Sequence, residues 1–515
     1  MDINYKINFR KKKLGNIYYI LFLVVYFVIL IYLANKVYIW EDESYSLHTS
    51  SHNLYKVIKL SYNFEGQPPF YFALLSLWRL IDSSIFFARL LSVIFIVCAA
   101  YFFQRLASFF TRKYDTRWMV VIFLLNPFTV WAALEIRLYA LIILLSTISI
   151  YYFLRYYLED KNKYIFILLV STLIGLYTQY FIAFLITSFA LCLLVFKGWK
   201  RCLKFCLYFI PVIVLFLPNF IFIPDQLSMA QTHLDINTKH LFDVIRTPQD
   251  FILALSMFNL NQALRWIIKI PFILLFIFAF SKLIKTKNSS DSSYKEILKV
   301  IIFLIAVCMI LYIVLVPSLS LIFQEKYMII TFSLFLLLFS VLKILTWKNY
   351  IYLVISLYFI VLMMVKYKYP EKTFNYEKVS EFIQKVELKN EPILFFGKSI
   401  LPPFEYYYKG DNPLLTLPPL KYDKDYYEER VKDTTDLNKQ IDSINTKTNT
   451  YVLVTESIVS FKYKQHLTRE MIQKFIKDNF LVTLDSTFKS RNSNRFLRVQ
   501  RLEKENDLSP KLQHH

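Results

Sequence analysis

Cysteine and glycine are both scarce in this chain of 515 residues, which has five of the first and six of the second. Cys202 and Cys206 stand one helical turn apart, but no histidine or acidic residue near them completes a metal site. All the cysteines lie in or beside apolar segments, and none falls in the polar C-terminal region: Cys98, Cys192, Cys202, Cys206 and Cys308. The sequence therefore shows neither a disulfide framework nor a zinc-binding pattern.

Internal repeats, low-complexity tracts and a cleavable signal are also absent. The first apolar stretch is too long for a signal peptide and lacks a small-residue cleavage site, so we expect it to be retained as a membrane span. The lack of internal symmetry also argues against the paired halves that many transporters show.

Apolar residues are abundant, at 56% of the chain with 18% aromatic, and the mean hydropathy is +0.41. These values are typical of polytopic membrane proteins. The net charge of +22 would suggest a nucleic-acid partner in a soluble protein. Here the excess Lys and Arg gather in short loops between apolar segments, so they report on topology, and we expect membrane lipids rather than nucleic acid as their partner.

The apolar segments predict eleven membrane-spanning helices in a transmembrane module of residues 1–369. Arg10-Lys11-Lys12-Lys13 precedes the first, which places the N-terminus in the cytoplasm. Basic residues of later loops, such as Arg117, Lys200 and Lys348, then fall on the cytoplasmic side, and the C-terminus lies outside. We expect an integral protein of the plasma (inner) membrane with spans at 17–37, 85–108, 118–134, 139–157, 163–178, 180–196, 203–223, 266–284, 297–318, 327–345 and 350–367.

One apolar stretch, Phe70 to Ile81, is too short to span. A helix of this length reaches roughly 18 Å, less than the ~30 Å of a hydrocarbon core. We predict an interfacial helix inside an outer loop at 38–84, entered through Gly66-Gln67-Pro68-Pro69, because proline starts a helix more readily than it sits inside one.

A change of composition after Tyr369 predicts a small extracytoplasmic α/β domain at 370–515. Amphipathic stretches at Lys378–Val386 and Arg469–Ile476 indicate helices. Short β-like runs occur at Ile393–Phe396, Tyr451–Val454, Leu481–Leu484 and Phe496–Val499.

The stretch Trp40-Glu41-Asp42-Glu43-Ser44-Tyr45 puts three carboxylates directly after the first span, on the predicted outer face. Carboxylates beside hydrocarbon are unfavourable and tend to be kept for a function. The alternative is a solvated helix end after a membrane anchor.

Three further polar groups fall at predicted outer boundaries. Arg89 opens the second span, Glu135-x-Arg137-x-Tyr139 occupies the turn between the third and fourth, and Glu325-Lys326-Tyr327 opens the tenth. Each has a structural alternative, because Arg89 could snorkel, Glu135 could simply pair with Arg137, and Lys326 could anchor a helix end. Together they place an acid and three cations on one side of the membrane.

These blocks resemble the pattern of glycosyltransferase family 39, GT-C-fold enzymes that include protein O-mannosyltransferases and lipid A aminoarabinose transferases. Asp42-Glu43 matches the family's acidic motif. Glu135-Ile136-Arg137-Leu138-Tyr139-Ala140-Leu141 resembles its Glu-Ala-Arg-Met-Tyr-Ala-Leu block, the most specific part of the match. The other similar segments follow in chain order: Gln67-Pro68-Pro69 for His-Pro-Pro, Ala88-Arg89-Leu90-Leu91-Ser92 for Arg-Leu-Pro-Ser, Tyr177-Thr178-Gln179-Tyr180 for Tyr-Thr-His-Tyr, and Lys326-Tyr327 for Arg-Tyr.

The sequence departs from the family pattern at three positions. Gln67 and Gln179 stand where the pattern has histidine, and Lys326 stands where it has arginine. Lysine keeps the charge of arginine but loses its bidentate hydrogen-bonding geometry.

The resemblance implies transfer of a sugar from a polyprenyl-phosphate donor to a lipid, glycan or protein acceptor on the outer face. Asp42 would act as the base, and Glu43 would help it or orient the acceptor. Glu135 and Gln67 would have supporting roles. The donor phosphate would be held by Arg89, Arg137 and Lys326, with hydrogen bonds from Tyr139 and Tyr327.

Two other interpretations stay open. A transporter or flippase of lipid-linked sugars would place charges near the middle of its spans or break helices in paired halves. A metal site at His48 and His52 would use their i,i+4 spacing, but nothing else in the sequence supports it. No metal is obligatory when the leaving group is a lipid phosphate, and we expect no cofactor.

Overall fold

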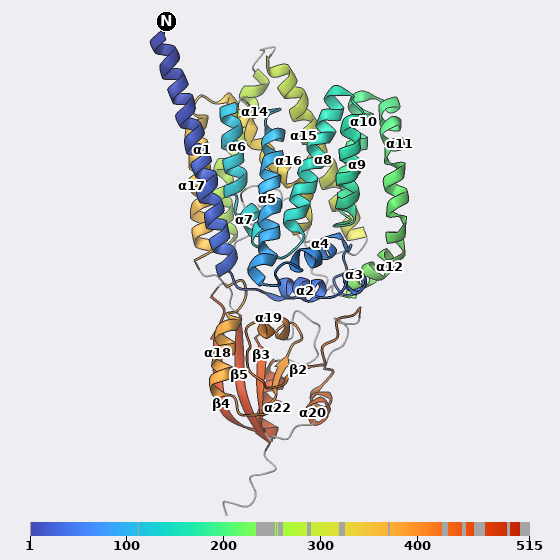
Figure 1. The fold of residues 1–515 in the computed structure, drawn as a ribbon, viewed down its shortest axis with the longest axis vertical. Coiled ribbons are helices and arrows are strands. Elements are labelled where there is room, and N and C mark those ends of the chain that lie inside the picture. Colours follow the sequence, from blue (N-terminus) through green and yellow to red (C-terminus); the bar gives the residue numbers. More distant parts are fainter. Residues whose placement is uncertain are drawn as a thin grey trace, which may run out of the picture. The chain divides into compact units, whose positions relative to one another are not determined.

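The computed structural model describes residues 2–111, 113–232, 253, 255, 261–285, 290–318, 325–368, 371–424, 431–444, 450–457, 469–491 and 495–504. The chain divides into two compact units, described separately below (Figure 1). The helical unit comprises Met1–Lys36, Gln67–Pro224 and Thr238–Lys368. The mixed unit comprises Val37–Gly66, Asp225–Asn237 and Tyr369–His515.

The described part of the helical unit consists of helices, most of them long and running side by side (Figure 1). They are α1 (Asp2–Lys36), α4 (Phe70–Arg79), α5 (Ile85–Ala107), α6 (Lys113–Leu125), α7 (Pro127–Ala133), α8 (Tyr139–Glu159), α9 (Lys163–Leu176), α10 (Ile182–Lys197), α11 (Trp199–Phe216), η1 (Leu217–Ile221), α14 (Gln262–Lys285), α15 (Ser290–Ser318), η3 (Glu325–Thr331), α16 (Phe332–Leu337), η4 (Leu338–Ile344) and α17 (Lys348–Lys366). Helix α12 (Ile223–Thr232) begins in this unit and ends in the mixed unit.

Seven described helices are long and apolar enough to cross a membrane, so the protein is a polytopic helical membrane protein, as predicted. They are Asn16–Lys36, Ile85–Ala107, Tyr139–Glu159, Trp199–Ile221, Gln262–Lys285, Tyr294–Leu315 and Lys348–Lys366. All eleven predicted segments contain apolar helix, but three are shorter: Lys163–Leu176, Ile182–Lys197 and Met328–Ile344. On length alone the structure supports seven spans, or eight with one bent pair, rather than eleven.

The bent pair lies at the predicted third span, where α6 and α7 meet at an angle of 60°. Pro127 opens α7 and has no N–H to continue the ladder of α6. The Asn126 side chain caps the new helix by accepting a hydrogen bond from the Phe128 N–H at 2.9 Å. The break leads into the connection that carries Glu135 and Arg137.

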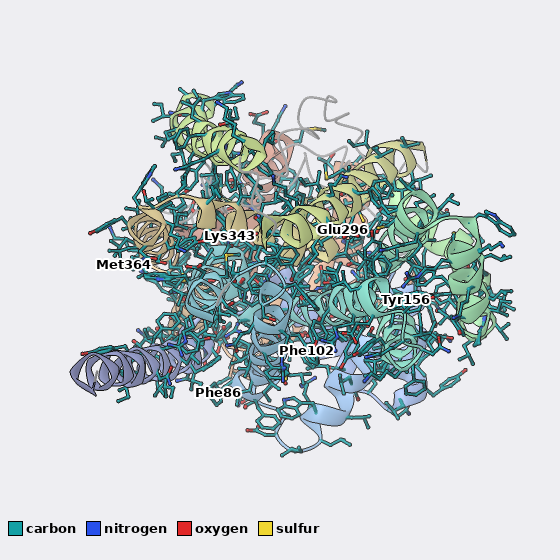
Figure 2. The ribbon with its side chains drawn as sticks, turned by 90° about the horizontal axis from the view of Figure 1, so that it is seen from above. Phe86, Phe102, Tyr156, Glu296, Lys343 and Met364 are labelled. Carbon is teal, nitrogen blue, oxygen red and sulfur yellow. The ribbon has the colours of Figure 1, made fainter. Side chains whose placement is uncertain are left out.

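Aromatic stacking and hydroxyl pairs hold the helical unit together. The Phe153 and Phe189 rings stack with centroids 4.1 Å apart and join α8 to α10. The Ser149 and Ser171 hydroxyls lie 2.9 Å apart and join α8 to α9. Seen along the helices, side chains fill the spaces between neighbouring ribbons, and α1 lies at the margin (Figure 2).

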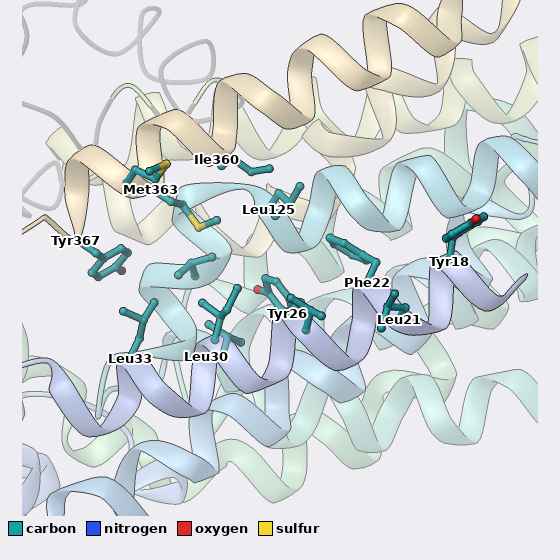
Figure 3. Close-up of a pocket in the computed structure, with 14 residues that line it drawn as sticks. Tyr18, Leu21, Phe22, Tyr26, Leu30, Leu33, Leu125, Ile360, Met363 and Tyr367 are labelled. Carbon is teal, nitrogen blue, oxygen red and sulfur yellow. The ribbon is translucent and has the colours of Figure 1, made fainter. Parts of the chain in front are cut away.

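Beside α1 an apolar cavity of about 610 Å³ separates this helix from α17 and the α6–α7 break (Figure 3). Tyr26 and Leu30 of α1 line one side, and Ile360 and Met363 of α17 line the other. The outward face of α1 is exposed and apolar, with Ile20 among its residues. Helix α1 therefore packs loosely against its neighbours, and hydrocarbon is the environment that suits its outer face.

The mixed unit contains a five-stranded sheet in the order β2-β1-β3-β5-β4. Strand β1 pairs in parallel with β2 and β3, whereas β5 is antiparallel to β3 and β4. Its described elements are α2 (Glu41–Ser50), α3 (Leu54–Asn63), α18 (Tyr376–Val386), β1 (Ile393–Phe396), α19 (Leu401–Glu405), β2 (Leu414–Leu417), α20 (Thr434–Asp442), β3 (Thr450–Glu456), α22 (Arg469–Asn479), β4 (Phe480–Lys489) and β5 (Phe496–Lys504). The predicted strands and helices after residue 370 are all present, and β2, α19 and α20 were not predicted.

Apolar clusters cover the two faces of this sheet. Leu394, Phe396 and Leu453 contribute to one cluster with residues of α20 and α22. Ile393, Phe395 and other side chains contribute to the second with residues of α18 and α19. The alternation of adjacent β1 residues between clusters is the period-2 pattern of a strand that is covered on both faces.

Residues 37–66 also pack within the mixed unit. Tyr45, Leu60 and Phe64 form a small core with Leu420 and Tyr422. The Ile39 N–H donates a hydrogen bond to the Tyr407 hydroxyl at 3.0 Å. The segment that carries the acidic motif is therefore anchored to the C-terminal region by both apolar and polar contacts.

Candidate functional site

The acidic motif forms the first turn of α2. Trp40 precedes the helix with extended backbone, and Glu41, Asp42 and Glu43 all lie in the first turn. Carboxylates are stabilised there by the positive end of the helix dipole. The sequence therefore favours a helix start at this point, and the backbone places neighbouring carboxylates in different surroundings.

Of these acids, Glu43 is fully buried, whereas Asp42 and Glu41 are half-buried. The Glu43 carboxylate pairs with the Lys372 ammonium at 2.7 Å, and Lys372 keeps only 14% of its side chain exposed. The Glu41 carboxylate accepts a hydrogen bond from the Tyr45 hydroxyl at 3.0 Å. This arrangement separates a reachable acid, Asp42, from a buried acid held by a lysine.

Two histidines follow on the same segment. The His48 ring stacks on the Tyr422 ring at 3.6 Å between centroids, and the His52 ring lies edge-on to His48 at 5.0 Å. Burial, with help from the nearby charges of His52 and Lys56, lowers the pKa of His48 to about 4. Among the described residues no group of three or more His, Cys, Asp or Glu side chains is placed to hold a metal ion.

Arg89 in the helical unit is only 1% exposed, so it does not snorkel to a surface. Its guanidinium donates a hydrogen bond to the Ala34 carbonyl at 3.0 Å. The last carbonyls of a helix lack partners within that helix, and Ala34 lies near the C-terminal end of α1. Arg89 therefore ties α5 to the end of α1 through a backbone carbonyl.

Glu135 and Arg137 lie in the non-helical connection between α7 and α8, as predicted. Glu135 is fully buried and Arg137 is 5% exposed. The Ser92 hydroxyl of α5 donates to the Glu135 carbonyl at 2.7 Å, and the Arg137 guanidinium lies 6.0 Å from the Phe72 ring centroid of α4. The structure thus brings this connection against α5 and α4.

The remaining predicted residues fall in different places. Tyr139 opens α8, is 3% exposed, and stacks on Trp131 at 4.7 Å between centroids. Gln67 is half-buried just before α4. Lys326 and Tyr327 belong to η3 by their backbone, but their side chains lie outside the described residues.

Sequence reasoning missed Lys372, Tyr407 and Tyr422. Lys372 follows the last span by a few residues, and its pairing with Glu43 joins two distant parts of the chain. Nothing local distinguishes it from other lysines of the polar region. Gln179, which was noted only as a departure from the family pattern, is 7% exposed in the helical unit.

Comparison with known proteins finds a likeness among solved structures. No family model matches the chain, and no curated protein matches it. Among solved structures, the crystal structure of ArnT from Cupriavidus metallidurans in the apo state is similar, with 10% sequence identity and a TM-score of 0.47. The match covers 94% of this chain and 98% of that chain.

Proposed function

We propose that this protein is a membrane glycosyltransferase that transfers a sugar from a polyprenyl-phosphate donor to an acceptor hydroxyl on the outer face of the membrane. The observation that carries the proposal is the burial of Arg89, Glu135 and Arg137 in a helical unit built for the membrane. Ionisable side chains in such surroundings are costly and mark functional sites by default. The acidic motif of α2 adds the carboxylates that such a transfer requires.

The proposed reaction is a direct displacement at the anomeric carbon. The acceptor oxygen forms a bond to that carbon, and its proton passes to the Asp42 carboxylate. The bond from the anomeric carbon to the phosphate oxygen breaks, its electron pair leaves with the lipid phosphate, and the configuration inverts. Proton removal by a placed base is commonly worth about 100- to 10,000-fold in rate.

The cations have a separate part in this proposal. Arg137 and Arg89 would stabilise the charge on the departing phosphate, with Lys326, Tyr139 and Tyr327 as further phosphate ligands. Glu135 would support the arginines. Arg89 already donates a hydrogen bond to the Ala34 carbonyl. Because a guanidinium has several N–H groups, the others would donate to the phosphate.

In the mixed unit, the Lys372–Glu43 pair supports a division of roles between the acids. A carboxylate fully buried against a lysine is suited to orient its neighbours, whereas half-buried Asp42 is suited to accept a proton. The C-terminal region would then shape access for a lipid, glycan or protein acceptor and would position the acidic turn. A single phosphate as leaving group needs no metal ion or other cofactor.

A transporter of lipid-linked sugars is the second candidate, and the break between α6 and α7 favours it. Broken helices line the substrate sites of many transporters. The two functions differ in product, because a transporter moves the donor without consuming it.

The proposal is tested with purified full-length protein in lipid nanodiscs, given polyprenyl-phosphate sugars and lipid extracts, glycans and proteins of the cell envelope as acceptors. Release of polyprenyl phosphate with a glycosylated acceptor is the expected result. Movement of intact donor across proteoliposomes without its consumption would favour the transporter instead.

The proposed orientation has its own test. Reporter fusions after Arg117 and Lys200 should give a cytoplasmic signal, and a fusion after Glu371 should give an external one. A cytoplasmic signal at Glu371 would contradict the placement of the C-terminal region outside.

A further inference from the structure

Two short polar segments of the helical unit meet through a backbone hydrogen bond. The Phe70 N–H, at the start of α4, donates to the Tyr177 carbonyl at 3.0 Å. Tyr177 directly follows the last residue of α9, Leu176, and Gln179 lies before α10 begins at Ile182. Gln67 stands three residues before Phe70, so the bond brings the two glutamine-bearing segments together.

Local backbone rules explain why both segments leave helical geometry here. Gly66 has a φ of +62°, which favours glycine, and Pro68 and Pro69 lack N–H groups. The chain therefore enters α4 through a turn and not as the continuation of an earlier helix. Near the other segment, the Gln179 N–H donates back to the Gly175 carbonyl at 2.7 Å and closes the end of α9.

The side-chain carbonyl oxygens of these two glutamines are buried. Gln179 as a whole is 7% exposed, and Gln67 is half-buried. Within the described part of the chain, neither Oε1 atom accepts a hydrogen bond. Buried carbonyl oxygens are satisfied in the great majority of native structures, since leaving one without a donor is unfavourable. Both oxygens are therefore suited to a ligand that brings donors.

We propose that Gln67 and Gln179 form a subsite for the hydroxyl groups of the transferred sugar; this rests on the proposed function. An amide offers an acceptor oxygen and two N–H donors, which matches hydroxyl groups that both donate and accept. It offers no charge for a phosphate, whose oxygens would face the carbonyl oxygens without a proton between them. The arginines hold the phosphate, and the glutamines recognise the sugar.

Helix α4 connects this subsite to Arg137. Phe72 lies two residues after Phe70, is fully buried, and has its ring centroid 6.0 Å from the Arg137 guanidinium. A donor whose phosphate contacts Arg137 therefore has its first sugar ring on the side of the helical unit where α4 starts.

The two acceptor oxygens also define the class of sugar. Each requires a donor from the ligand, which a neutral hexose or pentose supplies with its hydroxyl groups. A uronic acid keeps its ring hydroxyl groups, but a carboxylate replaces its C6 hydroxyl, so it has one donor fewer and a full negative charge that buried carbonyl oxygens disfavour. The subsite therefore favours neutral sugars over uronic acids.

The test measures dissociation constants for short soluble donors with full-length protein in nanodiscs. The probes are farnesyl phosphate and its glucosyl, galactosyl, mannosyl, arabinosyl and glucuronosyl derivatives. At least one neutral derivative should bind more tightly than farnesyl phosphate, and the glucuronosyl derivative should bind less tightly than that neutral derivative. Gln179→Leu and Gln67→Leu keep the bulk of the side chain and should each weaken binding of that neutral derivative about 2- to 10-fold.

The same variants should leave the dissociation constant of farnesyl phosphate unchanged, which a merely structural role would not predict. Thr178→Val is the matched control: its hydroxyl donates to the Ile174 carbonyl of the preceding helix α9 at 2.8 Å, so its loss should change neither constant. Equal weakening of both probes, weakening by Thr178→Val, or no neutral derivative that outperforms farnesyl phosphate would each overturn the subsite. Failure of the proposed function differs from all three, because wild-type protein would then not distinguish farnesyl phosphate from farnesol.

Discussion

Charged side chains have different surroundings at the two ends of the helical unit. Successive helices alternate in direction, so the loops around Asp115, Glu159 and Arg201 share one end. The first turns of α5, which carry Arg89, and the α7–α8 connection, which carries Arg137, share the other (Figure 1). At the first end charges form ion pairs, most of them partly exposed: Lys348–Asp115 at 2.9 Å, Arg155–Glu159 at 2.8 Å, Lys161–Glu159 at 3.1 Å, Arg201–Asp160 at 3.3 Å and Lys197–Glu296 at 3.4 Å.

At the second end three charged side chains are buried. Arg89, Glu135 and Arg137 are at most 5% exposed, and the contacts described for the two arginines are a backbone carbonyl and an aromatic ring. Basic residues in exposed loops help to orient a membrane protein, but the ion pairs that they form add little to its stability. Buried charges are unfavourable because they are desolvated, so they tend to be kept for a function. Substitutions should therefore have unequal effects on activity and stability at the two ends.

The largest effect is expected at the acidic turn. Asp42→Asn is nearly isosteric and removes proton acceptance, so turnover with polyprenyl-phosphate sugar should fall about 100- to 10,000-fold while donor binding stays intact. Glu43→Gln should impair turnover less. Glu41→Gln is the control, because Glu41 lies in the same turn and accepts a hydrogen bond from the Tyr45 hydroxyl. An active Asp42→Asn enzyme would remove the base assignment.

The next effect directly compares the two ends. Arg137→Ala removes a nearly buried guanidinium, and loss of one partner of a desolvated charge pair commonly costs about 2–5 kcal/mol. Donor use should therefore weaken by several tens of fold or more, and Arg137→Lys should recover only part. Arg201→Ala is the control at the end with the ion pairs, and it should leave the dissociation constant of the polyprenyl-phosphate sugar unchanged. Normal donor use by alanine variants of Arg89, Arg137 and Lys326 would place the phosphate clamp elsewhere.

The mixed unit offers a stability prediction. Lys372→Met should destabilise the protein by about 3–5 kcal/mol, because it leaves the buried Glu43 carboxylate without its ammonium. The double variant with Glu43→Gln should regain much of this loss, since no buried charge remains. Thermal unfolding of the purified variants measures both. If Lys372→Met were as stable as wild type, the Lys372–Glu43 pair would not contribute to the stability of the fold.

A smaller effect concerns pH. Burial lowers the pKa of His48 from 6.5 to about 4, so protonation favours the unfolded chain. The stabilisation is complete above pH 6.5 and is lost as the pH falls from 6.5 towards 4. His48→Phe keeps an aromatic ring against Tyr422, so the variant should lose less stability than wild type over this window. Identical pH profiles of thermal unfolding would contradict the prediction.

Hydropathy and short-range patterns predicted most of the fold. The apolar segments all contain helix, and β1 spans the predicted residues Ile393–Phe396. The bend at Asn126-Pro127 was not predicted, although this dipeptide is a turn signal. The four-residue strand β2 was also missed, because so short a run has little periodicity to detect.

The site was less predictable than the fold. The sequence predicted the turn that carries Glu135 and Arg137 because this connection is local, whereas their role in a site stays a prediction. The partners of the acidic turn depend on tertiary packing: Lys372 reaches Glu43, and Tyr422 stacks on His48, from segments distant in sequence. No local pattern encodes such pairs. The burial of the Gln67 and Gln179 side-chain oxygens likewise depends on tertiary packing and could not be predicted from the local sequence.

The smallest effect is expected at the ion-pair end, where it provides the baseline for the comparison. Lys161 pairs with Glu159 at 3.1 Å, but 58% of its side chain is exposed to solvent. Glu159 keeps other partners, since Arg155 lies 2.8 Å away and the Tyr164 hydroxyl donates to it at 2.9 Å. Lys161→Ala should therefore change the free energy of unfolding by less than about 1 kcal/mol and leave turnover unchanged. A loss of activity as large as that of Arg137→Ala would mean that the ion-pair end also takes part in catalysis, and the two ends would no longer differ in the way proposed.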